Sequence, residues 1–250
     1  MTREPAMDQL NQPNQSHRNR LLQLLPLSDS HELVPHLEAV TLEYRQPLCE
    51  ANEPVRSVYF PVTGVVSLVN IMGNGSAAEV GTIGNEGLAG LPVILGDEMG
   101  PMTAYVQVPG TGLRLRAEVL RSALQRSAGM RMVMQHYAHA FFNQVAQSAA
   151  CNHFHDLEQR CCRWLLMTHD RVQSEQFLLT QEFLGMMLGV QRSSVTLVAS
   201  KLKADGLIEY TRGQVVILDR KKLEHRSCEC YAVSKREFDR LLGPPTGARV

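Results

Sequence analysis

Residues 180–202 constrain the fold of this 250-residue chain more than any other part of the sequence. Thr180 is a residue type that caps helix N-termini, and apolar residues recur at helical spacing on both sides of Gly189. Glycine readily adopts the left-handed conformation that ends a helix, so Gly189 separates two short helices. Gly185 is small enough to let them cross closely. The pattern predicts a helix-turn-helix, whose second helix can enter a DNA major groove.

Short β-prone runs alternate with turn residues between positions 39 and 116. Glycine and proline recur throughout this region, a texture that predicts an antiparallel β roll or barrel. The dipeptide Asn74-Gly75 is a strong signal for a hairpin turn between two strands. A short helical pattern covers residues 19–37, and the polar residues 1–18 are expected to lack order.

A long helix is expected from Gly129 to about Cys151, after a shorter one over residues 117–124. Apolar residues on the long helix repeat in steps of four and three, as in a coiled coil. A β domain needs only one side of this helix, so we interpret the stripe as a dimer seam in preference to an ordinary core-facing stripe. The seam residues are Met130, Met134, Tyr137 and Phe141.

A further helix is expected over residues 155–169, ahead of the helix-turn-helix. Two β-prone segments, residues 208–210 and 215–218, follow the motif on either side of the turn 211–214. They predict a two-stranded wing.

This order of a β roll, a long central helix and a winged helix-turn-helix resembles the Crp/Fnr family of bacterial transcription regulators. The similarity covers roughly residues 19–223, and its strongest carriers are DLEQRCCRWLL, LTQEFLGMMLGVQRSSVTLVASKL and the wing GLIEYTRGQVVI with DRKKLE after it. The stretches VYFPVTGVVSL and GTIGNEGLAG are similar to the effector domain of this family. The resemblance implies a homodimer that binds a two-fold symmetric site on double-stranded DNA and couples it to an effector domain. RNA polymerase is a further expected partner.

The predicted fold class is α+β, with an N-terminal antiparallel β roll of the cyclic-nucleotide-binding type, a long dimerisation helix and a C-terminal winged helix-turn-helix. The expected division is a disordered tail (1–18), a β-roll effector domain (19–126), a dimerisation helix (127–152), a winged helix-turn-helix DNA-binding domain (153–225) and a C-terminal extension (226–250).

Arg192 opens the second helix of the motif, where side chains first reach base edges. By family position it matches an arginine that contacts DNA, and a guanidinium can bind guanine O6 and N7 bidentately. Leu197 stands where well-known family members have a second base-reading arginine, so the usual operator sequence is not expected. Hydroxyl and basic neighbours are candidate contacts to phosphates or bases. The expected DNA contacts are Thr180, Gln181, Gln191, Arg192, Ser193, Ser194, Thr196, Leu197, Lys201, Lys203 and Arg212.

Family members that bind cyclic AMP hold its phosphate with backbone amides and with an arginine that precedes Ser or Thr. Here the arginine position reads Met102, so a buried phosphate would lack its main charge partner. The glutamate that would bind the ribose is out of register, and Val145-Ala146 replaces the hydroxyls that would face adenine. These departures argue against cyclic AMP and leave two alternatives open, a different small-molecule effector or no ligand at all. The candidate effector pocket comprises Gly84, Asn85, Glu86, Gly87, Met102 and Thr103.

The six cysteines are scattered along the chain and are interpreted as reduced thiols. Iron–sulfur sensors of the family use an N-terminal cysteine cluster, whereas Cys49 is the only cysteine before residue 150. Histidines and cysteines between positions 136 and 155 are interpreted as helix surface, so no metal ligand and no certain cofactor are expected. The alternative is a redox- or metal-responsive regulator that uses Cys/His residues, with Cys228-Glu229-Cys230 as a redox pair or soft-metal site.

Charge is distributed unevenly, because the first 151 residues are net acidic and the remainder is net basic. This asymmetry favours nucleic-acid contact by the C-terminal part. The sequence has no apolar run that could cross a bilayer and no signal peptide, so we expect a cytoplasmic protein without membrane contact. It also has no nucleophile elbow, phosphate loop or zinc-hydrolase motif, so we expect neither catalytic residues nor enzymatic activity.

Overall fold

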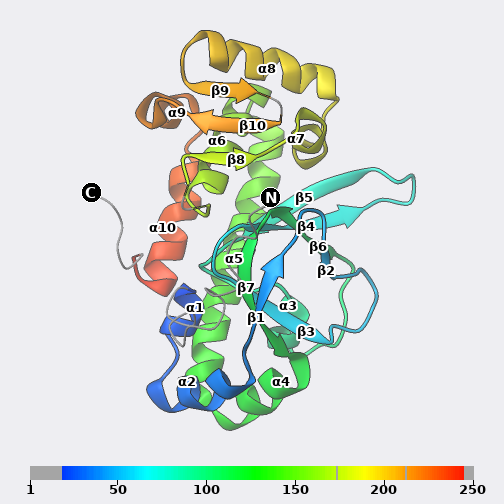
Figure 1. Ribbon diagram of the computed structural model, residues 1–250, viewed down its shortest axis with the longest axis vertical. Coiled ribbons are helices and arrows are strands. Elements are labelled where there is room, and N and C mark those ends of the chain that lie inside the picture. The colour runs from blue at the N-terminus through cyan, green and yellow to red at the C-terminus, as the bar shows by residue number, and fades with distance from the viewer. Residues whose placement is uncertain (1–18, 173, 212, 245–250) are drawn as a thin grey trace, which may run out of the picture.

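The computed structural model describes residues 19–172, 174–211 and 213–244, and the expected tail 1–18 lies outside them (Figure 1). The described part is α+β, as predicted. An antiparallel β roll packs against the long helix α5, and the helix-turn-helix follows at the far end of that helix (Figure 1).

The roll occupies residues 38–116, all of which the structure describes, and its strands form two antiparallel sheets with orders β1-β7-β3 and β2-β6-β4-β5. The predicted hairpin is confirmed between β4 and β5, where Gly75 has a φ of 81° and Asn74 Oδ1 accepts a hydrogen bond from Ser76 N at 2.9 Å. The strands are β1 (Glu38–Leu42), β2 (Pro47–Cys49), β3 (Ser57–Pro61), β4 (Val65–Ile71), β5 (Ala77–Ile83), β6 (Thr103–Val108) and β7 (Gly110–Arg116).

Helices cover one side of the roll. Ser127 begins the long helix by accepting a hydrogen bond from Met130 N at 3.0 Å, which satisfies one of the free amides of the first turn. The helices of this part are α1 (Arg20–Gln23), α2 (Leu27–Leu33), η3 (Val34–His36), α3 (Leu91–Leu95), α4 (Ala117–Arg126) and α5 (Ala128–Phe154).

The apolar stripe of α5 faces the roll of its own chain. Its four residues Met130, Met134, Tyr137 and Phe141 are at most 2% exposed and belong to the same hydrophobic core as the roll. Tyr137 Oη donates a hydrogen bond to the Leu88 carbonyl at 2.9 Å. The prediction that these side chains form a dimer seam is therefore wrong, because they lie on the side of α5 that packs against the roll of the same chain.

The expected C-terminal extension folds into a helix that runs back along α5 (Figure 1). Helix α9 (Arg220–Arg226) leads into α10 (Cys230–Leu242). Asn143 Nδ2 on α5 donates to Glu237 Oε2 on α10 at 2.9 Å, and Phe238 and Leu242 enter the core of the roll. The C-terminal helix therefore contacts both the roll and α6, the helix that precedes the helix-turn-helix.

The helix-turn-helix part of the molecule begins with Asp156, which forms a capping box with Gln159 at the start of α6. The predicted wing is present, and a third strand, β8, pairs with β10 to give the sheet order β8-β10-β9. The elements are α6 (Leu157–His169), β8 (Gln176–Leu178), α7 (Gln181–Leu188), α8 (Arg192–Ala204), β9 (Ile208–Thr211) and β10 (Gln214–Ile217).

This part packs directly against the roll. Val65 and Val69 of β4 share a hydrophobic core with Trp164 of α6 and Phe183 of α7. The ring of Phe183 also meets Tyr105 of β6 edge to face, with 6.0 Å between ring centroids. The first helix of the motif is therefore held by the roll. Among the described residues, no helix is both long and apolar enough to cross a membrane.

Candidate nucleic-acid interface

The local signals of the helix-turn-helix act as the sequence predicted. Thr180 Oγ1 accepts a hydrogen bond from Phe183 N at 3.1 Å and so caps α7. Gly189 ends α7 with a φ of 65°. A methyl group on Gly185 would lie only 3.0 Å from the Val190 carbonyl oxygen, so glycine permits the close approach of the turn to α7.

Helix α8 buries one face and presents the other to solvent. Val195, Ala199 and Leu202 are buried in the motif. Leu197 is 74% exposed, so it does not pack against the rest of the chain. The other residues predicted to read DNA from α8 also lie on or beside the exposed face: Gln191, Arg192, Ser193 and Thr196 are exposed, and Ser194 is half-buried.

Thr196 and Gln181 interact with each other inside the motif. Thr196 Oγ1 lies 2.8 Å from Gln181 Oε1 and 3.0 Å from the Arg192 carbonyl oxygen. Its hydroxyl therefore links the start of α7 to the start of α8. Thr196 would have to release its present acceptors before its single hydroxyl proton could go to a phosphate, whereas Gln181 accepts through Oε1 and can still donate through Nε2.

The two predicted lysine contacts are paired with carboxylates of the same chain. Lys201 Nζ lies 2.5 Å from Glu158 Oε2, and Lys203 Nζ lies 2.5 Å from Glu209 Oε1. Arg226 also binds Glu158. Exposed pairs of this kind contribute only about 0–1 kcal/mol, so a DNA phosphate could compete for either lysine.

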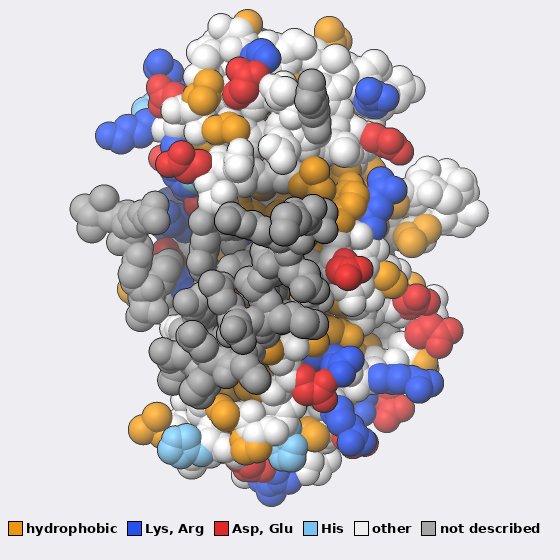
Figure 2. Space-filling model, in the orientation of Figure 1, with side chains coloured by type: hydrophobic (Ala, Val, Ile, Leu, Met, Phe, Trp, Pro, Cys, Tyr) orange, Lys and Arg blue, Asp and Glu red, His pale blue; other side chains and the backbone are white. Residues whose placement is uncertain are grey.

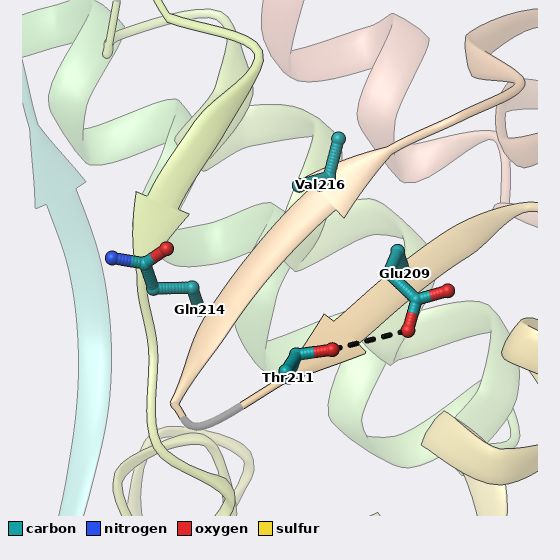
Figure 3. Close-up of a pocket in the computed structure, with 4 residues that line it drawn as sticks. All are labelled: Glu209, Thr211, Gln214 and Val216. Carbon is teal, nitrogen blue, oxygen red and sulfur yellow. Dashed lines mark hydrogen bonds between the residues drawn. The ribbon is translucent and has the colours of Figure 1, made fainter.

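The wing offers no strongly basic surface among its described residues. A shallow pocket there is lined by Glu209, Thr211, Gln214 and Val216, and Thr211 Oγ1 donates to Glu209 Oε1 at 3.1 Å (Figure 3). A carboxylate in this position disfavours a phosphate. On the face drawn in Figure 2, basic and acidic side chains are interspersed around α8 and the wing. The predicted wing contact Arg212 lies outside the described residues.

The loop predicted to bind an effector is filled by Arg171, which follows α6. Arg171 Nε donates to Glu86 Oε1 at 2.8 Å, and its Nη2 donates to Gln144 Oε1 of α5 at 3.1 Å. All three side chains are buried. A methyl group on Gly84 would lie 2.5 Å from Arg171 Cγ, and one on Gly87 would overlap the ring of Tyr137. The sequence carried no signal for this buried pair, since an isolated arginine usually lies at the surface.

The strand register separates the two halves of the predicted effector pocket. Across β4, Val66 pairs with Ile83 and Val106, whereas Val69 pairs with Thr103. Ile83 is the last residue of β5 before the loop 84–87, and Val106 is the residue of β6 at the same height. Thr103 lies three residues, or about 10 Å, along β6 from Val106. Its hydroxyl accepts a hydrogen bond from Ala51 N at 3.3 Å. The structure therefore does not gather Met102 and Thr103 with Gly84, Asn85, Glu86 and Gly87.

A titratable carboxyl group also joins the roll to α6. Trp164 Nε1 donates to Glu79 Oε1 at 2.9 Å, and Ser67 Oγ lies 2.7 Å from Glu79 Oε2. Burial raises the pKa of Glu79 to about 7. In its protonated form Glu79 donates to Ser67, which frees the serine hydroxyl to donate to Gln107 at 2.5 Å. Loss of this proton would remove the hydrogen bond that Glu79 donates to Ser67, so we expect this contact between the roll and α6 to respond to pH.

Comparison with domain families identifies two matches that lie in the order seen in the structure. Residues 39–127 match the cyclic nucleotide-binding domain, and residues 159–226 match the Crp-like helix-turn-helix domain. No curated protein sequence gives a match.

Solved structures with this overall fold include several regulators. FixK2 from Bradyrhizobium japonicum is 15% identical, with a TM-score of 0.66 over 77% of this chain and 98% of that chain. A putative transcriptional regulator of the crp/fnr family from Eubacterium rectale is 18% identical, with a TM-score of 0.64 over 82% of this chain and 96% of that one. The c-di-GMP-responsive global regulator CLP of Xanthomonas campestris is 16% identical, with a TM-score of 0.62 over 78% and 100% of the two chains. At these identities the likeness concerns the fold.

Proposed function

The chain belongs to the Crp/Fnr family of transcription regulators, and we propose that it acts as a homodimer whose two α8 helices read the half-sites of a symmetric DNA operator. Members of this family are regulators and not enzymes. The observation that carries the proposal is the exposed face of α8, where Arg192 and Leu197 project from a helix whose other face is buried. RNA polymerase is the further partner that we infer from the family.

Selection of bound sequences from random DNA duplexes at near-physiological salt tests this proposal. The wild-type protein should enrich a two-fold symmetric sequence, with half-sites one helical turn apart. Arg192→Ala should weaken binding to it by ~1–3 kcal/mol and relax the choice at one base pair. Arg236→Ala removes the same charge from an exposed position of α10 and serves as the control. Equal binding by wild type and Arg192→Ala, or no enriched sequence, would refute the proposal.

We propose that the dimer forms through the solvent face of α5, opposite the stripe that the roll covers. Met132 and Phe142 are 54% and 67% exposed there, although both are large and apolar. They belong to an exposed series with the alternating spacing of three and four that lets two helices pair. Helix α10 covers the neighbouring flank at Asn143 and Gln147 and leaves this series open. The series comprises Met132, Gln135, His139, Phe142, Ala146, Ala149 and His153.

Analytical ultracentrifugation of Phe142→Glu tests the dimer face. Burying one phenylalanine per chain stabilises association by about 1.5–3 kcal/mol per side chain, so its loss should raise the dimer dissociation constant at least tenfold. Leu95→Glu, at another exposed apolar position on α3, is the control. A variant Phe142→Glu that dimerises as tightly as Leu95→Glu would exclude this face.

A constitutive regulator without a small-molecule ligand is the second candidate function, and the Arg171–Glu86 pair favours it. The Arg171 side chain packs against Gly84 and its guanidinium is already paired with Glu86, so a ligand phosphate at the loop 84–87 would compete with this carboxylate. Operator affinity should then be unchanged by cyclic mononucleotides and cyclic dinucleotides. A saturable change in affinity with any of them would instead support gating by an effector, which would have to displace Arg171.

A further inference from the structure

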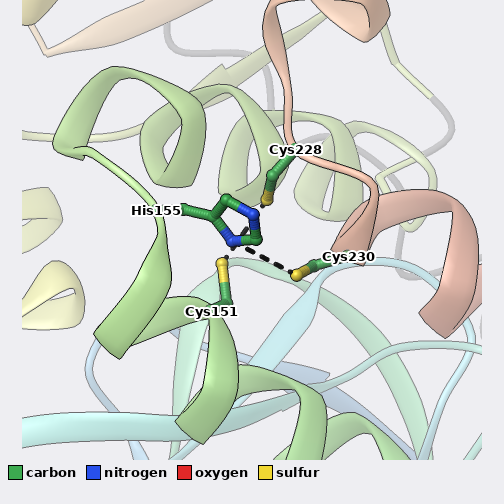
Figure 4. Close-up of side chains that lie close together, drawn as sticks. All are labelled: Cys151, His155, Cys228 and Cys230. Atoms are coloured by element: carbon green, nitrogen blue, oxygen red, sulfur yellow. Dashed lines mark hydrogen bonds between the residues drawn. The ribbon is translucent and has the colours of Figure 1, made fainter.

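Four potential metal ligands from distant parts of the sequence meet where α5 joins α6 (Figure 4). They are Cys151, His155, Cys228 and Cys230, and their ligand atoms all lie within 4.8 Å of one another. The three thiols are at most 3% exposed, and the His155 side chain is 15% exposed. All of these cysteines are free thiols.

Each ligand is placed by the end of a helix. Cys151 lies in the last turn of α5, and His155, four residues later, is the C-cap of that helix. Cys228 lies between α9 and α10, and Cys230 is the first residue of α10. Because α10 packs along α5, its beginning meets the end of α5, and the imidazole lies among the three sulfur atoms (Figure 4).

We propose that these four side chains bind a thiophilic divalent metal ion, with Zn²⁺ as the ion they fit best. Zinc in structural sites is tetrahedral, with Cys₃His among its common ligand sets and Zn–S bonds of about 2.3 Å, which places ligand atoms roughly 3.5–3.8 Å apart. Here Cys151 Sγ lies 3.5 Å from Cys228 Sγ, and Cys230 Sγ lies 3.5 Å from His155 Nδ1. The cluster is close to the geometry that the ion requires.

The surroundings suit a metal-bound histidine and thiolates. His155 Nε2 lies 3.2 Å from Glu229 Oε2, so the nitrogen that does not face the sulfur atoms can donate to a carboxylate. Gln147 Nε2 lies 3.0 Å from Cys230 Sγ and can stabilise the negative thiolate. Binding Zn²⁺ releases the three thiol protons to solvent and leaves the oxidation state of every atom unchanged.

Neither domain match includes the cluster, because the matches cover residues 39–127 and 159–226. The site thus belongs to the parts of the chain that connect and follow the two domains. A metal ion there would fasten the start of α10 to the junction between the long helix and the DNA-binding part. The sequence expectation of no metal site considered Cys151 with His136, His139, His153 and His155. Of these, Cys151 and His155 join the cluster, whereas the other three histidines are exposed on α5 and do not.

Cobalt binding by the full-length, reduced protein tests the proposal. Titration with Co²⁺ without oxygen should saturate at one ion per chain and give the thiolate charge-transfer and visible bands of a tetrahedral complex. Cys228→Ser should weaken binding at least ~100-fold, whereas His155→Cys should retain a tetrahedral ion with a shifted spectrum. Glu229→Gln should weaken binding about 10–100-fold. Cys49→Ser, in the roll and outside the cluster, should bind as the wild type does.

Zinc competition and thermal unfolding complete the test. Zn²⁺ should displace Co²⁺ and raise the melting temperature of the wild type and of Cys49→Ser, but not of Cys228→Ser. The proposal is overturned if the charge-transfer band is absent, if Cys49→Ser removes it as fully as Cys228→Ser does, or if mass spectrometry finds a Cys151–Cys228 disulfide in the reduced preparation. None of these readouts involves DNA, so the result is independent of the proposed function.

Discussion

The buried pair between Arg171 and Glu86 makes a strong prediction about stability. Arg171 Nη2 lies 2.8 Å from Glu86 Oε1, and the residues are 7% and 5% exposed. The guanidinium also donates to the Met167 carbonyl at 2.7 Å. Arg171→Met keeps most of the volume of the side chain but removes the charge. Glu86 Oε1 then retains the Gly84 amide at 3.1 Å, and the buried carboxylate has no cation beside it.

Removing one partner of a buried ion pair typically costs 3–5 kcal/mol, because the remaining charge is uncompensated. We expect Arg171→Met to lower the free energy of unfolding by about that amount. Urea unfolding at fixed protein concentration and neutral pH measures it. The double variant Glu86→Gln/Arg171→Met removes both charges, so it should be more stable than Arg171→Met alone. Arg236→Met, an exposed control, should change stability by no more than about 0.5 kcal/mol.

The reasoning fails if Arg171→Met costs less than ~1 kcal/mol, or if the effects of the two single variants simply add in the double variant. Additive effects would mean that the two side chains do not interact energetically. The same variants should also differ in limited proteolysis of the junction after α6, since Arg171 connects that junction to the roll and to α5.

Two further predictions concern pH and helix capping. Burial raises the pKa of Glu79 to about 7 from the usual 4.5, so between these pH values the folded protein binds more protons than the unfolded chain does. The free energy of unfolding should therefore fall by up to ~1.4 kcal/mol per pH unit as pH rises from 4.5 to 7. Above pH 7 the stabilisation by protonated Glu79 stays lost. Glu79→Gln should flatten this part of the unfolding profile, and an unchanged profile would contradict the assignment. Thr180→Ala should destabilise the protein by about 1 kcal/mol in urea unfolding because α7 loses its cap, while Thr180→Ser should keep most of it; equal losses in both variants would show that the hydroxyl is not the cause.

The sequence predicted the helix-turn-helix well because its signals are local. Thr180 as a cap and Gly189 as a helix terminator act through backbone geometry within a few residues, and neither depends on the rest of the fold. The hairpin at Asn74-Gly75 is predictable for the same reason.

The orientation of α5 could not be obtained in this way. Apolar residues occur on two of its faces, with Tyr137 on one and Phe142 on the other, and either stripe alone has the spacing of a helix contact. Only the position of the roll decides which stripe is buried in the chain. Arg171 is a similar case, because its burial depends on a glutamate 85 residues away.

The metal-ligand cluster and the C-terminal helix were only partly predictable from the sequence. Cys151 and His155 are one helical turn apart, and Cys228 and Cys230 are two residues apart, so each pair is visible in the sequence but is too short to identify a site. The two pairs become informative only when α10 brings them together. Phe238 and Leu242, four residues apart, carried a helical signal for α10 that the prediction did not use.

The return of α10 to the roll has a topological consequence. Arg20, in the first described helix, bonds to the Gly243 carbonyl, so the two ends of the described chain are tied together on the same side of the molecule. Besides the direct packing between them, the roll and the helix-turn-helix part are therefore connected by two segments of the chain: the α5–α6 connection, and α10, which begins beside α6 and ends on the roll. A large rotation of the helix-turn-helix away from the roll would have to detach one end of α10. The described part of the chain therefore ends beside the roll, at the opposite end of α10 from the helix-turn-helix.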